Sequence, residues 1–214
     1  MTDRMESPPL VDQRVAQLFA LVKEALAGAT ESLLSVEPVT AQAIIDADEE
    51  IDDLTSEVDR LVWERIDAGS VSPLELRHLV AVLLILPELE RSADLAEHIA
   101  QRAARNLGAE MNAVSRGLVQ RMSEVALDMW GAAANAYADR QALAFALNEA
   151  DEEIDWLHAR LTDEIANGGM SNPVATEVTL LARFYERLGD HAVNLARRIA
   201  RFSVNHQEAV SPSS

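Results

Sequence analysis

The sequence contains no cysteine, and several other residue types are scarce. Without cysteine there is no disulfide and no thiolate metal site, so any bound metal must use oxygen or imidazole ligands. There are only 8 glycines and 7 prolines among 214 residues, and aromatic residues make up 4%. Because helix-breaking residues are rare while alanine, leucine and glutamate are plentiful, the composition favours helix.

Basic residues are also in short supply. The chain has 18 Lys and Arg against 36 Asp and Glu, and its formal net charge is −18. A surface of this sign repels phosphate backbones, which disfavours direct nucleic-acid binding. It equally disfavours electrostatic docking on anionic lipid.

Long hydrophobic runs are missing too. The longest, Leu79 to Leu86, is far too short to span a bilayer, and the first ten residues lack the apolar core of a signal peptide. We therefore predict a cytoplasmic protein without direct membrane insertion. Any peripheral association with the inner face of a membrane would be made through a partner.

Apolar residues recur at three- and four-residue steps along six segments, as Val11, Val15, Leu18 and Val22 illustrate. No stretch alternates at period two for long enough to predict a strand. Ser72 before Pro73, and Thr40 after Glu37-Pro38, are candidate helix caps. The predicted helical segments lie near 10–35, 40–68, 73–106, onward from Gly108, 139–166 and 173–202.

An internal repeat relates the two halves of the chain. The run Asp46-Ala-Asp-Glu-Glu-Ile-Asp52 returns as Glu149-Ala-Asp-Glu-Glu-Ile-Asp155, and Leu89-Glu-Arg-Ser-Ala-Asp94 returns as Tyr185-Glu-Arg-Leu-Gly-Asp190. The predicted fold class is therefore all-α, with two tandem antiparallel three-helix bundles. We place the first at 10–106 and the second at 109–203, with flexible ends at 1–9 and 204–214.

The spacing of the acidic motifs from the turns is preserved in both halves. The hairpin between the two motifs is about one helical turn longer on each arm in the first half than in the second. Since both arms lengthen together, the acids of the two helices stay level. Four carboxylates are predicted to meet between two helices in each half: Asp48, Asp52, Glu90 and Asp94, then Asp151, Asp155, Glu186 and Asp190.

Two interpretations of these acids remain open. Convergent carboxylates repel one another, and a hard cation such as magnesium, calcium, manganese or iron would relieve the repulsion. The alternative is an ordinary solvated helix face, with Arg91 and Arg187 neutralising the acids without metal. Preserved pairing in both halves favours the metal site.

Other candidate residues carry weaker signals. Glu75 and His78 have the Glu-x-x-His spacing of di-iron bundles, but only one helix carries it. His98 is placed to reach the first cluster, and His191 is expected to face away from the second. The three tryptophans, Trp63, Trp130 and Trp156, are expected to be packing residues. No catalytic residue is predicted, because the chain has no P-loop, dinucleotide-binding turn or nucleophile elbow.

The run from Ala182 to Ala196, A-R-F-Y-E-R-L-G-D-H-A-V-N-L-A, resembles the A-R-x-x-E-R-I-G-D-H-A-x-N-I-A signature of the PhoU family. The two D-E-E-I-D segments resemble that family's other acidic motif, and the resemblance covers about residues 10–203. The first half departs from the pattern at Ser92-Ala93, where Ile-Gly is usual, and at His98, where Asn is usual. The second cluster is thus the closer match.

The resemblance implies a non-enzymatic regulator that represses the phosphate-starvation response. It implies two partners, a phosphate ABC transporter ATPase and a phosphate-sensing histidine kinase of a two-component system. A homodimer is also expected, because an apolar face on a long helix would support one. It also implies metal cations, magnesium, manganese, iron or zinc, on the eight acids named above. Two alternatives stay open: a metal-dependent helical-bundle enzyme, a hydrolase or an oxidoreductase, and an interaction protein whose acids bind nothing.

Overall fold

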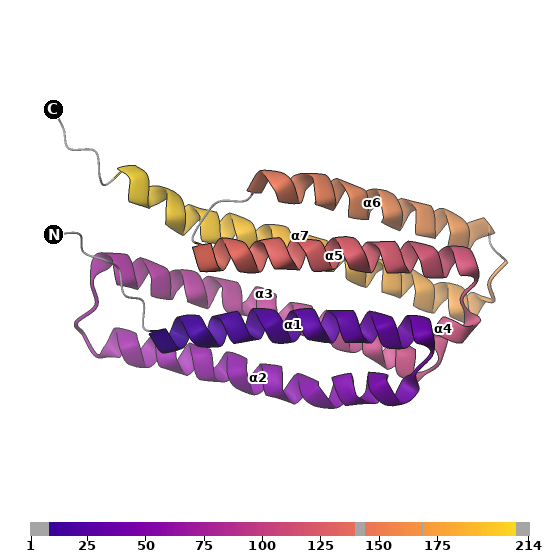
Figure 1. Ribbon diagram of the computed structural model, residues 1–214, viewed down its shortest axis with the longest axis horizontal. Helices are drawn as coiled ribbons and strands as arrows, with labels where there is room; N and C mark the ends of the chain where they lie inside the picture. The colour runs from indigo at the N-terminus through magenta and orange to yellow at the C-terminus, as the bar shows by residue number, and fades with distance from the viewer. Residues whose placement is uncertain (1–8, 140–143, 168, 209–214) are drawn as a thin grey trace.

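The computed structural model describes residues 9–139, 144–167 and 169–208 (Figure 1). Within these ranges every regular element is a helix and none is a strand, so the predicted all-α class is confirmed. Six helices are long and one is a single turn. They are α1 (Pro9–Ser35), α2 (Pro38–Asp67), α3 (Pro73–Ala104), α4 (Leu107–Glu110), α5 (Ala113–Asp139), α6 (Ala144–Asn167) and α7 (Asn172–Glu208).

The helix starts follow from local chemistry. Ser72 is the N-cap of α3, where its hydroxyl accepts a hydrogen bond from the backbone N–H of Glu75 at 3.2 Å. The expected role of Thr40 as a cap is wrong. Because Pro38 suits the first helical position, α2 starts there with Glu37 as its N-cap, and Thr40 lies inside the helix.

Each half forms an antiparallel bundle of three long helices, α1–α2–α3 and α5–α6–α7, as the repeat predicts. The halves pack side by side through α1 and α3 of the first against α5 and α7 of the second, while α2 and α6 lie on the outside (Figure 1). Helix α7 continues to Glu208, beyond the predicted end of the second bundle at 203. The rest of the predicted flexible ends, 1–8 and 209–214, lies outside the described residues.

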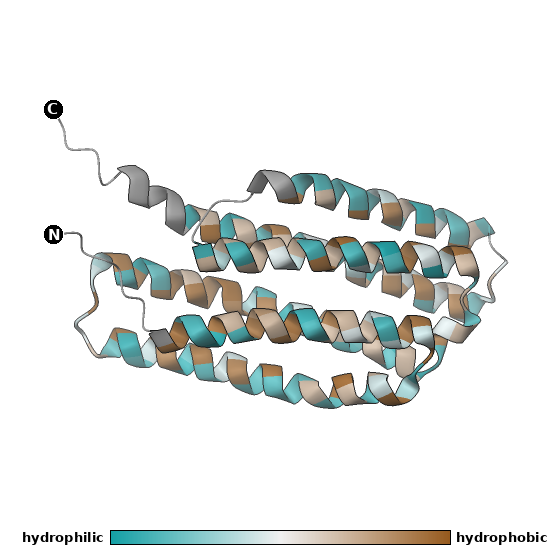
Figure 2. Ribbon diagram, in the orientation of Figure 1, coloured by the Kyte–Doolittle hydropathy of each residue, from teal (hydrophilic) through white to brown (hydrophobic). Residues whose placement is uncertain are grey.

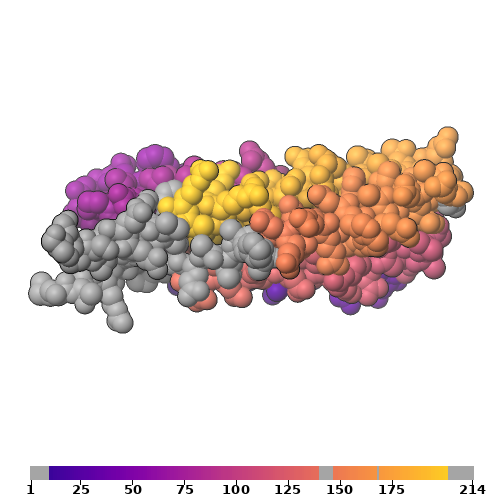
Figure 3. All heavy atoms as spheres, turned by 90° about the horizontal axis from the view of Figure 1, so that it is seen from above, coloured from indigo at the N-terminus to yellow at the C-terminus, as the bar shows by residue number. Residues whose placement is uncertain are grey.

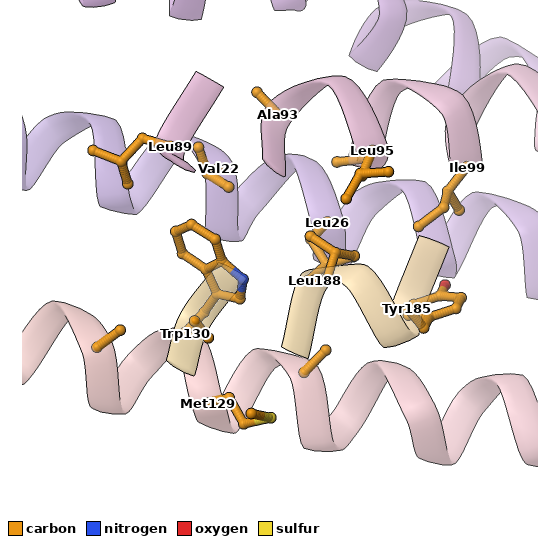
Figure 4. Packing of buried hydrophobic residues seen from close by; sticks show 14 of the residues in the cluster. Val22, Leu26, Leu89, Ala93, Leu95, Ile99, Met129, Trp130, Tyr185 and Leu188 are labelled. Carbon is orange, nitrogen blue, oxygen red and sulfur yellow. The ribbon is translucent and has the colours of Figure 1, made fainter. Parts of the chain in front are cut away.

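One hydrophobic core runs through both halves. Hydrophobic and hydrophilic residues share every helix (Figure 2), and the buried residues of all six long helices form a single cluster. Figure 4 shows Trp130, Leu188 and Leu26 converging from α5, α7 and α1. The hydroxyl of Tyr185, 0% exposed, lies 2.7 Å from Thr30 Oγ1, which accepts from Ser123 at 3.0 Å. Burial raises the pKa of Tyr185, so this link stays uncharged.

Of the three tryptophans that were expected to be packing residues, Trp130 is buried and the other two are exposed. Trp130 is 1% exposed, whereas Trp63 on α2 and Trp156 on α6 are 50% and 58% exposed. The difference follows from topology, because α2 and α6 are the outer helices. Figure 3 shows the elongated molecule from the side of α6 and α7. No helix in the described part of the chain has the length and apolarity needed to cross a bilayer.

The two halves meet at the short helix α4. Asn106 before it has a left-handed backbone, with φ of 61°, which turns the chain from α3 into α4. Gly108 then lies against the C-terminal end of α1. Arg116 of α5 donates to the carbonyl oxygen of Gly108 at 2.6 Å and to that of Leu34, which ties α1, α4 and α5 together.

Candidate metal-binding site

The first acidic cluster lies between α2 and α3. Burial, followed by repulsion from Glu97, Asp52 and Asp94, raises the pKa of Asp48 to about 6. Burial and then Asp52 raise the pKa of Asp94 as well, while Arg91 and His98 oppose that rise. Three of the four predicted acids therefore share one electrostatic neighbourhood.

Glu90, the fourth predicted acid, shares a groove between α2 and α3 with Asp52. Asp52 and Glu90 line a groove of about 450 Å³ together with Thr55, Ser56 and Asp59. Glu97 is a member of the cluster that the sequence argument missed. The available signal was its position three residues after Asp94, on the same face of α3.

The second cluster lies between α6 and α7 and brings all four predicted acids together. Burial raises the pKa of Asp151, and Asp155, Asp190 and Glu186 each raise it further, while Arg197 opposes the rise. Glu186 is also paired within α7, where Arg183 donates to its Oε1 at 2.5 Å. Arg183 and Arg197 thus partly neutralise the acids of the second cluster.

Gly189 leaves room in the second cluster. A Cβ there would lie 3.6 Å from Oδ1 of Asp151 and 3.1 Å from Cδ1 of Ile154. The repeat places Ala93, 1% exposed, at the equivalent position of the first half. The second cluster is therefore the more open to an additional atom between its two helices.

The carboxylate ligands are chemically suited to a hard cation, but their side chains lie too far apart to hold one as they stand. Carboxylate oxygens suit magnesium, manganese or iron. Burial, and after it repulsion between the acids, raises the pKa values of Asp48 and Asp151, and a cation would relieve the repulsion. Across residues 9–139, 144–167 and 169–208, however, no three Asp, Glu or His side chains are close enough to hold a metal ion. Ligation by these acids stays a prediction, and it requires side-chain or helix adjustments.

His78 and His191 make contacts outside the two acidic clusters, whereas His98 lies beside the first. His78 Nε2 lies 2.8 Å from Oδ1 of Asp12, and Glu75 is paired with Arg65 at 2.7 Å, so these two residues do not form a metal pair. His98 is near the first cluster and stacks on Phe184, with ring centroids 5.4 Å apart. His191 faces away from the second cluster, as expected, and contacts Glu88 of α3.

The raised pKa of Asp48 makes a pH-dependent prediction for the metal-free protein. A carboxyl whose folded pKa is about 6, against 3.8 in the unfolded chain, stabilises the fold below pH 4. This stabilisation is lost as the pH rises through 6. In urea unfolding between pH 4 and 7, Asp48→Asn should therefore gain stability relative to the parent as the pH rises. A stability difference that does not change with pH would contradict the raised pKa.

A family model for the PhoU domain matches this chain twice, at residues 15–103 and 119–199, one match for each bundle. The chain belongs to the PhoU family. Both matches include the acidic helix pairs described above, so the two clusters occupy corresponding places in two PhoU domains.

Relatives and solved structures agree with this assignment. A protein of Caulobacter vibrioides, named a phosphate-specific transport system accessory protein PhoU homolog, is 33% identical over 80% of this chain and 76% of its own. The phosphate-specific transport system accessory protein PhoU homolog 2 of Mycobacterium tuberculosis is 28% identical over 88% of this chain and 91% of its own. The crystal structure of PhoU from Pseudomonas aeruginosa matches with a TM-score of 0.83 over 91% and 96% of the chains, at 22% identity. The crystal structure of the phosphate transport system regulatory protein PhoU from Streptococcus pneumoniae matches with a TM-score of 0.80. The match covers 92% of this chain and 94% of that one, at 22% identity. The structural matches support the fold.

Proposed function

We propose that this PhoU protein is a cytoplasmic regulatory adaptor of phosphate homeostasis. It links a phosphate ABC transporter, through the transporter's ATPase subunit, to a phosphate-sensing histidine kinase, and it keeps the phosphate-starvation response off when phosphate is plentiful. It acts as an adaptor rather than as an enzyme, and as a homodimer. Contact with the inner face of the membrane is made through its partners.

The observation that carries the proposal is the pair of facing acidic helix motifs, one pair in each PhoU domain. Relatives over most of the chain are named accessory proteins of the phosphate-specific transport system. Exposed Trp63 and Trp156 lie on the outer helices α2 and α6, where a protein partner has access to them.

A metal cation supplies charge neutralisation in this proposal. In the second domain Asp151 and Asp155 of α6, with Glu186 and Asp190 of α7, would hold it. In the first domain Asp48 and Asp52 of α2, with Glu90 and Asp94 of α3, have the same role. The carboxylates of each pair of helices repel one another without it, so the cation would draw the outer helix of each bundle toward the inner one.

Deletion of the gene tests the regulatory role. The deletion strain should express phosphate-starvation genes at high phosphate, because a repressing link is lost, and a plasmid copy should restore repression. The measurement is a reporter for a phosphate-regulated promoter at high and low phosphate. Normal repression in the deletion strain, with no second PhoU gene present, would contradict the proposal.

A further inference from the structure

A groove on the outer side of the first bundle combines an apolar floor with an acidic rim. It lies between α2 and α3 and has a volume of about 450 Å³. Leu83, Leu86 and Pro87 of α3 form the floor. The rim consists of exposed polar residues, Asp52, Ser56, Asp59 and Glu90. We call this feature the α2–α3 groove.

Apolar side chains continue the floor toward the turn between α2 and α3. Leu76 and Val80 precede Leu83 by seven and three residues on the same face of α3, and they are 42% and 38% exposed. On α2, Trp63 follows Asp59 by four residues and is 50% exposed. The groove and these side chains form one solvent-exposed surface that is apolar and bordered by acids.

The second bundle has polar residues where the first has this apolar surface. The repeat aligns Glu90 of α3 with Glu186 of α7. In that alignment three exposed polar residues of α7 take the place of three apolar residues of α3: Thr176, Thr179 and Arg183 for Val80, Leu83 and Pro87. The same helix pair therefore forms without apolar side chains at these positions, so packing of the bundle does not explain their presence in the first half.

Within residues 9–139, 144–167 and 169–208, the three acids of the rim form no ion pair. In the second bundle Arg183 donates to Glu186, three residues later in α7. Pro87 stands at the corresponding place before Glu90 and supplies no charge. The rim is therefore open to cationic side chains from another molecule.

The floor also offers hydrogen-bond acceptors. Thr55 Oγ1 lines the groove, is shielded from solvent and has no hydrogen-bond partner in the described part of the chain. Pro87 has no N–H, so the carbonyl oxygen of Leu83 lacks the hydrogen bond that the residue four positions later gives in a regular helix. Lys and Arg side chains combine an apolar stem with N–H donors at the end, so they suit a floor and a rim of this kind.

Neither a second copy of the chain nor its own ends has this chemistry. The formal net charge is −18, so two copies that met through their acidic rims would repel each other. Residues 209–214, A-V-S-P-S-S, carry no basic residue, and residues 1–8, M-T-D-R-M-E-S-P, carry one arginine against two acids. Charge complementarity thus favours a different protein as the occupant.

We propose that the α2–α3 groove docks a helix of a partner protein that is apolar along one face and bears Lys or Arg at the edges of that face. A groove between two helices accepts a third helix by the same side-chain packing that joins helices within a bundle. The inference rests on the adaptor role proposed above and identifies the surface that holds a partner. It requires no bound cation.

The test measures binding of a synthetic helical peptide to the full-length protein by fluorescence anisotropy. The peptide has leucine along one face and lysine and arginine at its edges, and a second peptide has glutamate at the same edges. EDTA in the buffer keeps cations off the acids of the first cluster. The parent protein should bind the basic peptide at least about tenfold more tightly than the acidic one.

Apolar substitutions locate the binding site. Trp63→Ala should weaken binding of the basic peptide by about tenfold or more, because a large apolar contact is lost. Val80→Thr with Leu83→Thr, which introduces the residues of the second bundle, should weaken it by a similar factor. The matched control is Leu180→Ala, which truncates a side chain on α7 that is 40% exposed, and it should change the affinity by less than about twofold.

Charge reversal tests the rim. Asp59→Lys should weaken binding of the basic peptide by about fivefold and strengthen binding of the acidic peptide. Asp163→Lys makes the same change at an exposed position of α6 and should alter neither affinity by more than about twofold. Trp63 and Asp59 are exposed, so their variants report on the groove even if Val80→Thr with Leu83→Thr fails to fold.

Repression in cells tests whether the groove serves the adaptor role. In the deletion strain, a plasmid copy with Trp63→Ala and Asp59→Lys should fail to restore repression at high phosphate. A copy with Leu180→Ala and Asp163→Lys should restore it, with equal protein abundance shown by immunoblotting.

The outcomes that would overturn the inference can be told apart. Equal binding of the basic peptide by the parent, Trp63→Ala and Asp59→Lys proteins would show attraction to the acidic surface at large. Groove variants that convert a dimer to a monomer in sedimentation velocity would assign the groove to a second copy. Full repression by the Trp63→Ala with Asp59→Lys copy would exclude the groove while leaving the proposed function in place. Normal repression without any copy would contradict the proposed function itself, and the inference would fall with it.

Discussion

Gly108→Ala is expected to destabilise the protein by about 3 kcal/mol, with the midpoint of thermal unfolding about 6–12 °C lower. A Cβ at this position would lie 1.8 Å from the carbonyl oxygen of Leu33 and 2.9 Å from its carbonyl carbon. Both are backbone atoms, so no side-chain rotation removes the clash. Helix α4 or the end of α1 must move, and Arg116 donates to carbonyl groups of both segments.

Gly117→Ala is the matched control, since it makes the same chemical change on α5 where a Cβ would meet nothing within 4 Å. It should stabilise the protein by about 0.5–1 kcal/mol, because alanine loses less conformational entropy than glycine in a helix. Thermal and urea unfolding of the two variants against the parent measure both effects. A Gly108→Ala protein as stable as the parent would show that α4 does not lie so close to α1.

Removal of the second cluster is expected to abolish stabilisation by metal. At a cation concentration 100 times the dissociation constant, binding to the folded state alone adds about 2.7 kcal/mol. For a chain of this size this amounts to about 5–10 °C in the thermal midpoint. The change Asp155→Asn with Glu186→Gln takes one ligand from each helix, so added magnesium, manganese or iron should no longer raise the midpoint through this site.

In the absence of metal the same double change should raise stability slightly. Asp155 and Glu186 both raise the pKa of Asp151, so their neutralisation relieves repulsion in the folded state. The control, Glu152→Gln with Asp163→Asn, removes the same charge from exposed positions of α6. If metal raises the midpoint of the Asp155→Asn with Glu186→Gln protein as much as that of the parent, these residues are not ligands. The solvated-face interpretation would then hold.

The all-helical fold and the two bundles were predictable from local patterns. Apolar residues at helical spacing, Ser72-Pro73 and the repeated acidic motifs each report on a short stretch of chain, and the structure has the corresponding helices. The cap at Thr40 was wrong for an equally local reason, because Pro38 can start the helix by itself. Trp63 and Trp156 were expected to be packing residues but are exposed, because residue type does not say which helices lie outside.

The sequence by itself determined that each half places acids level on two antiparallel helices, since helix period and distance from a shared turn are properties of one hairpin. Only the tertiary structure decided which helices of the two halves meet. It placed Glu97 beside Asp48, Arg183 on Glu186, and Glu88 between His191 and Arg198. The physical reason is that the α3–α7 contact depends on how two separate apolar surfaces fit. No spacing along the chain encodes the partner of a buried Glu88 that lies in the other half.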